Sequence, residues 1–150
     1  MSGLQDRAMD YVADKQDWVR MKPSGDFTVS STSAAKVAPI LITGALGRCF
    51  EKQTNQVKVL RSGVYYANLM FMAASVGNTT SVKQVSIYVN GTNISSARMA
   101  IGTLQSVTQV VLLELSTGDI LTMHTQFLET SGTRKLSQHS HIDLFPVVLA

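Results

Sequence analysis

Charged side chains are scarce in the middle of this 150-residue sequence. Between residues 63 and 127, only Lys83, Arg98, Glu114 and Asp119 carry a formal charge. A strand that buries one face normally shows a polar and often charged second face to water. Here the second face of the alternating runs consists of Ser, Thr, Asn, Gln, Ala and Met. We therefore expect the outer surfaces of this protein to be partly buried in an assembly.

Cysteine pairs, long apolar runs and basic clusters are also lacking. The single cysteine, Cys49, cannot form an internal disulfide, so we expect a reduced and half-buried thiol. No apolar run approaches the ~20 residues that cross a bilayer, and the N-terminus does not have the basic and then apolar form of a signal peptide. The net charge of +3 is not concentrated in a patch. We expect neither a membrane nor a nucleic acid as partner, and no secretion through a signal peptide.

No catalytic constellation is recognisable in the sequence. It contains no glycine-rich phosphate loop, no cysteine pair and no His-Glu-x-x-His motif. In an extended strand, His139, His141 and Asp143 share one face, where they could form half of a metal site or a ring around a symmetry axis. We favour a polar strand end at the surface or in a subunit contact. The sequence therefore predicts no enzyme activity, no cofactor and no required metal.

The first 36 residues predict an arm. A helix is expected over residues 2–20, with Leu4, Tyr11 and Trp18 on one face. A helix of this length is marginal alone in water, so its apolar face must dock elsewhere. Small polar residues at 30–35 are typical of a linker. We therefore divide the chain into an arm, 1–36, and a β domain, 37–150. The three apolar residues are expected to anchor the arm on a neighbouring subunit or a larger particle; packing on its own domain is the alternative.

The rest of the sequence consists of short apolar or alternating runs that turn residues separate. Asn90-Gly91 and the segment 117–119 are compact turns of the kind that join antiparallel strands. Strands are expected at 27–30, 37–43, 57–60, 63–74, 82–89, 97–104, 108–115, 119–127 and 140–149. So many short strands without alternating helices predict an all-β fold, an antiparallel sandwich or jelly roll.

Four of these segments, taken in order, resemble the C1q and tumour-necrosis-factor superfamily. Residues 62–67, with Gly63 and Tyr65, resemble its Gly-x-Tyr-x-Phe strand. Residues 85–91 resemble its strand ending in an Asn-Gly turn, and residues 110–121 its apolar strand, Gly-Asp turn and following strand. Residues 140–149 resemble the closing strand, in which Pro146 stands where a paired N–H is expected. The resemblance covers residues 40–149 and implies a trimeric antiparallel jelly roll.

This resemblance and the predicted arm together suggest a structural protein. Phage decoration proteins and the tips of phage fibres use this trimeric jelly roll. We expect a homotrimeric capsid decoration (cement) or head-fibre protein, assembled in the host cytoplasm. It would sit on the virion surface, bound to the major capsid protein or another virion protein.

Two other functions stay open at this point. One is a receptor-binding head of a phage tail fibre or spike, which would use the loops 77–81, 90–96 and 129–138. The other is a jelly-roll protein that binds a small ligand or a metal. The loops carry no Trp or Tyr, which are the side chains enriched in binding hot spots, and this favours decoration over receptor binding.

Overall fold

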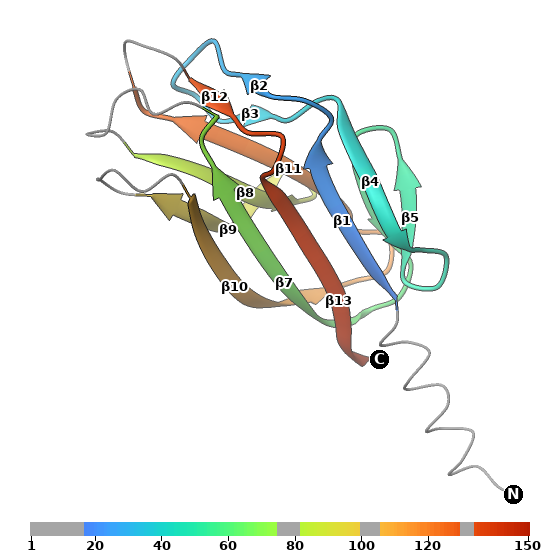
Figure 1. The fold of residues 1–150 in the computed structure, drawn as a ribbon. Coiled ribbons are helices and arrows are strands. Elements are labelled where there is room, and N and C mark those ends of the chain that lie inside the picture. Colours follow the sequence, from blue (N-terminus) through green and yellow to red (C-terminus); the bar gives the residue numbers. More distant parts are fainter. Residues whose placement is uncertain (1–16, 75–81, 100–105, 130–133) are drawn as a thin grey trace, which may run out of the picture.

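The computed structural model describes residues 17–74, 82–99, 106–129 and 134–150, which form an all-β sandwich (Figure 1). The first sheet has five strands, in the order β10 (Ser106–Leu115), β7 (Gly63–Met72), β13 (His141–Leu149), β1 (Trp18–Pro23) and β4 (Ile40–Ala45). The second contains, in order, β5 (Phe50–Gln53), β6 (Gln56–Val59), β11 (Ile120–Phe127), β8 (Lys83–Val89) and β9 (Thr92–Met99), with β3 (Ala35–Lys36) also paired to β11. A small third sheet pairs β12 (Lys135–Leu136) with β2 (Phe27–Thr28). No helix long and apolar enough to span a membrane occurs in these ranges.

The core lies between the two large sheets and follows the alternation of side chains along the strands. On β7 every second residue from Tyr65 to Phe71 is fully buried, whereas the residues between them lie half-buried on the outer face. Met123 and Phe127 of β11 are buried on the inner face of the opposite sheet. The rings of Phe71 and Phe127 meet with centroids 5.6 Å apart and join the two sheets. The expected antiparallel sandwich is confirmed.

Hydrogen bonds join the two turns that the sequence predicts. Asn90 and Gly91 have positive φ angles of 51° and 82°, as the two-residue hairpin between β8 and β9 requires. Asn90 Nδ2 donates a hydrogen bond to Asp119 Oδ1 at 2.9 Å, and the N–H of Ile120 donates to Asn90 Oδ1 at 2.9 Å. Because Asp119 belongs to the turn between β10 and β11, these contacts hold the two turns together.

The predicted helical arm is wrong for the residues that the structure describes. Trp18–Pro23 is strand β1, which lies between β13 and β4. Val19 and Met21 are fully buried in the core. Residues 18–23 alternate with a period of two, which suits a strand, and the helical spacing of more distant apolar residues does not apply to them. Residues 1–16 lie outside the described residues.

The predicted linker also belongs to the sandwich. β3 pairs with β11, and Gln126 of β11 donates from Nε2 to the backbone oxygen of Thr32 at 3.0 Å. Arg134 donates from Nε to the backbone oxygen of Val29 at 3.1 Å. The boundary predicted after residue 36 is therefore not a domain boundary, because the segment before it is hydrogen-bonded to strands from the other end of the chain.

Most of the remaining predicted strands are confirmed within a few residues. β3, β5 and β12 have no counterpart among the predictions, and β9 begins at Thr92, five residues before the strand predicted from residue 97. The strand pairing of β13 with β7 shifts register between Pro146 and Val148. A bulge is a position where a strand tolerates proline, since no ladder N–H is required there.

The core assignment predicts the effect of truncating Leu69, which is fully buried on β7. We expect Leu69→Ala to lower the free energy of unfolding by about 2–5 kcal/mol, because it leaves a cavity that the sandwich fills only in part. The same change at Leu128, which is exposed, should cost less than about 1 kcal/mol. Urea unfolding followed by circular dichroism measures both. Equal losses in the two variants would contradict this placement of the core.

Candidate assembly surface

The outer face of the five-stranded sheet gathers most of the exposed apolar side chains. Eight large hydrophobic residues are exposed in the described part of the chain, and six of them lie on this sheet: Trp18, Leu41, Val110, Leu112, Phe145 and Val148. Leu112 and Val148 are 61% and 60% exposed. Single surface hydrophobics are ordinary, but a gathering on one face marks an interaction site. We call the face that these six residues define the outer apolar surface.

Strand register brings several of these side chains into one row. Leu112 of β10 pairs with Tyr66 of β7, and Tyr66 pairs with Phe145 of β13. The rings of Tyr66 and Phe145 stack with centroids 4.7 Å apart. Continuing the register of β13 and β1 by one residue places Trp18 opposite Phe145. A row of large apolar and aromatic side chains therefore crosses four neighbouring strands.

A hollow lies at one end of the outer apolar surface, where β7 begins and β13 ends. It has a volume of about 320 Å³ and is lined by Gly63, Val64, Glu114, Leu115, Ser116, Val148 and Ala150. A Cβ atom on Gly63 would lie 2.3 Å from the backbone oxygen of Val148. The glycine therefore lets β13 lie directly against β7. The hollow is large enough to accept a side chain from another protein chain.

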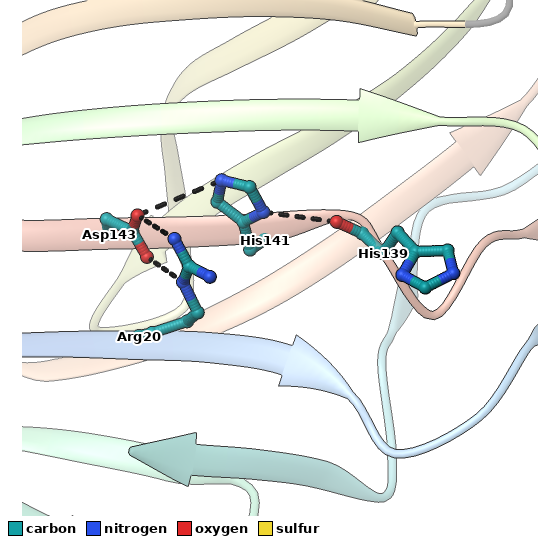
Figure 2. Close-up of polar contacts among 4 residues, drawn as sticks. All are labelled: Arg20, His139, His141 and Asp143. Atoms are coloured by element: carbon teal, nitrogen blue, oxygen red, sulfur yellow. Dashed lines mark hydrogen bonds and ion pairs between the residues drawn. The ribbon is translucent and has the colours of Figure 1, made fainter. Parts of the chain in front are cut away.

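A charged pair lies in the middle of this surface (Figure 2). Arg20 of β1 donates from Nε and Nη2 to the two carboxylate oxygens of Asp143 of β13, both at 2.7 Å. Their side chains are 39% and 22% exposed. Hydrogen bonding to Asp143 raises the pKa of Arg20. Because a bidentate arginine–carboxylate pair is strong and fixed in geometry, this part of the surface presents a rigid polar group.

The three residues considered as half of a metal site do not converge. His141 Nδ1 lies 3.1 Å from the backbone oxygen of His139, and it donates because a carbonyl oxygen only accepts. His141 Nε2 lies 3.8 Å from Asp143 Oδ2, whereas Figure 2 shows the His139 ring turned away from both. The described residues contain no group of three metal-ligating side chains. His141 therefore lies beside the Arg20–Asp143 pair, and His139 does not.

Of the three predicted anchor residues, the structure places only Trp18. It is 42% exposed at the start of β1, on the outer apolar surface. Leu4 and Tyr11 lie outside the described residues, so the role of the three as an anchor stays a prediction. Sequence reasoning missed that Phe145 lies opposite Trp18 and that Tyr66 stacks on Phe145. An alternation of outward side chains on β7 and β13 was the available signal, but it does not reveal the register between the strands.

Cys49 is a structural residue. It is a free cysteine and fully buried, more so than the half-buried thiol that the sequence predicted. Burial raises the pKa of the thiol to about 11, so it stays protonated and unreactive near neutral pH. Its backbone N–H donates to Asp17 Oδ2 at 2.9 Å. This hydrogen bond holds the start of β1 beside the connection between β4 and β5.

The outer face of the six-stranded sheet is polar by contrast. Gln84 Nε2 donates to Gln126 Oε1 at 3.4 Å. Tyr88 stacks on His124 with ring centroids 3.7 Å apart. Burial lowers the pKa of His124, and the positive charge of Lys36 lowers it further. Only one of the two sheets therefore carries an apolar outer face.

The lowered pKa of His124 predicts that acid destabilises the fold. As the pH falls, His124 of the unfolded chain takes up a proton near the ordinary histidine pKa, at a higher pH than His124 of the folded chain does. The free energy of unfolding therefore falls as the pH drops below about 6.5 towards the folded pKa. We expect the midpoint of thermal unfolding to fall more between about pH 7.5 and about pH 5 in the unmutated protein than in His124→Gln. Equal falls would show that His124 is not responsible.

Comparison with known proteins gives the fold. No protein-family model and no curated protein matches the chain. Murine APRIL at pH 8.0 superposes with a TM-score of 0.61 at 17% identity, over 87% of this chain and 98% of that one. Eiger TNF from S. frugiperda gives 0.64 at 16% identity, over 89% and 94%, and rabbit GITRL gives 0.56 at 14%, over 89% and 96%. This chain has the C1q/TNF-like jelly-roll fold.

The four motifs that suggested the resemblance lie on strands of both large sheets. They fall on β7, on β8 with its hairpin turn, on β10 and β11 with the turn between them, and on β13. The structural neighbours are TNF-family ligands. At identities below one fifth, this likeness establishes the fold, and the function rests on the surfaces of this chain.

Proposed function

We propose that the protein is a structural building block that acts as a homotrimer. The observation that carries the proposal is the outer apolar surface, on which six of the eight exposed large hydrophobic residues gather. An exposed apolar patch of this kind marks an interface, which a partner covers in solution. The resemblance to a trimeric superfamily favours two further copies of the same chain as the partners that cover the outer apolar surface. In this assembly the outer apolar surfaces of the three copies lie towards one another.

The position of β10 supports contact between copies at this surface. β10 is the last strand on one side of the five-stranded sheet, as Figure 1 shows. It carries Val110 and Leu112, both exposed on the outer face. An edge strand with apolar outward side chains invites packing by another chain. A head-to-tail contact, in which this edge meets the centre of the next copy's sheet, closes into a ring when the rotation between copies is one third of a turn.

We propose further that the trimer decorates a virus particle, as a capsid decoration or head-fibre protein on the virion surface. The small polar hairpin tip at Asn90-Gly91 supports a structural role over a receptor-binding one. Residues 1–16 precede β1, whose first residue, Trp18, lies on the outer apolar surface. Leu4 and Tyr11, together with Trp18, are the proposed contacts to the major capsid protein or another virion protein.

A lysine at position 112 tests the homotrimer. We expect Leu112→Lys to yield a folded monomer, because the interface would bury an unpaired charge whereas a single copy would leave it in water. Light scattering gives the mass, and thermal unfolding verifies the fold. The matched control is Ile94→Lys, at an exposed position on β9 of the other sheet, which should remain a trimer. An unmutated protein that is monomeric at micromolar concentration would refute the proposal.

Removal of residues 1–16 tests the attachment to particles. Because β1 is retained, the truncated chain should fold and keep the mass of a trimer. We expect it to be lost from virus particles, as measured by electron microscopy of purified particles that carry a label at the C-terminus of the protein. Full occupancy by the truncated chain would place the anchor elsewhere and would support the receptor-binding alternative.

A further inference from the structure

A row of polar side chains crosses the centre of the outer apolar surface. Val110 of β10 pairs with Asn68 of β7, and Asn68 pairs with Asp143 of β13. Asp143 pairs in turn with Arg20 of β1, and Figure 2 shows the contact between their side chains. Three neighbouring strands therefore each place one polar residue in the same row. We call Asn68, Asp143 and Arg20 the polar row.

Large side chains border the polar row on both sides. On one side lies the row of Leu112, Tyr66 and Phe145. On the other side, Met70 pairs with His141, whose Nε2 lies 3.8 Å from Asp143 Oδ2. A chain that covers the outer apolar surface therefore covers the polar row as well and removes it from water.

The polar row is not satisfied within one copy. Asn68 Oδ1 is buried and has no hydrogen-bond partner among the described residues. Buried polar atoms in folded proteins are nearly always paired, so an orphan acceptor calls for an explanation. Arg20 directs two of its five N–H donors at Asp143. Because the Arg20 side chain is 39% exposed, its guanidinium remains accessible to an acceptor on a neighbouring copy.

We infer that the polar row determines how neighbouring copies align and that it restricts the assembly to one stoichiometry. The inference rests on the proposed homotrimer and specifies which residues of its interface make it specific. Apolar side chains attract one another without a preferred direction. The row of Leu112, Tyr66 and Phe145 alone therefore tolerates several alignments of a neighbouring copy. An alignment that lays apolar side chains over Arg20 and Asp143 buries both charges without new partners and is disfavoured.

The charged pair is a determinant of specificity rather than of affinity. Removing two charges from water costs about as much as their attraction returns. Replacing both by apolar residues of similar size often leaves binding unchanged or tighter, whereas removing one partner leaves an uncompensated charge. Single and paired substitutions therefore have opposite expected effects, which makes the role of the polar row testable.

The test compares three variants of the full chain by native mass spectrometry and analytical ultracentrifugation. Arg20→Leu combined with Asp143→Leu should still associate, at an equal or lower dissociation constant, but as a mixture of stoichiometries. Asn68→Leu should give a similar mixture. Arg20→Leu alone should raise the dissociation constant by about tenfold or more, because it leaves Asp143 without its partner.

The matched control replaces a polar pair on the other sheet, Gln84→Leu combined with Gln126→Leu. It should keep a single stoichiometry, and a mixture there too would show that added apolar area alone is responsible and would overturn the inference. A uniform homotrimer in the variants of the polar row would also overturn it while leaving the homotrimer proposal intact. A monomeric unmutated protein would refute both. If circular dichroism shows that the paired variant does not fold, Asn68→Leu decides the question.

Discussion

The closing strand β13 is the element on which the rest of the structure depends. It pairs with β7 on one side and with β1 on the other, so it joins the middle of the chain to its beginning. Its inward residues Ile142 and Leu144 are fully buried in the core. Its outward residues include Asp143, which pairs with Arg20, and Phe145, which stacks on Tyr66. Both lie on the outer face of the five-stranded sheet. One strand therefore completes both the core and the proposed interface.

The fold was predictable because its signals are local. The alternation of β7, the hairpin turn at Asn90-Gly91 and the turn that contains Asp119 each lie within a few consecutive residues. The positive φ angles of Asn90 and Gly91, and the hydrogen bond from the N–H of Ser116 to Asp119 Oδ2, follow from residue type. β1 was missed because Trp18 also continues a helical spacing. The decisive fact, that Val19 and Met21 enter the core, depends on a partner strand that begins more than a hundred residues later.

The proposed interface was predictable only in outline. The shortage of charge indicated covered surfaces, and Trp18, which was predicted to be an anchor, is exposed. The other residues in the row of Trp18 could not be predicted, because Tyr66 and Phe145 come from distant segments and align with it only through the register of three strands. The bidentate contact of Arg20 with Asp143 has the same origin. Composition reveals how much of a face is apolar, but register decides which side chains meet there.

The distance along the chain between β1 and β13 has a consequence for synthesis. Arg20 and Asp143 are separated by 123 positions along the chain. Contacts between such distant segments form late. A ribosome-bound chain that still lacks β13 has neither Phe145, which stacks on Tyr66, nor Asp143, which pairs with Arg20. Chains emerging side by side from one messenger RNA therefore do not carry the complete outer apolar surface until β13 has been synthesised and has paired with β1 and β7.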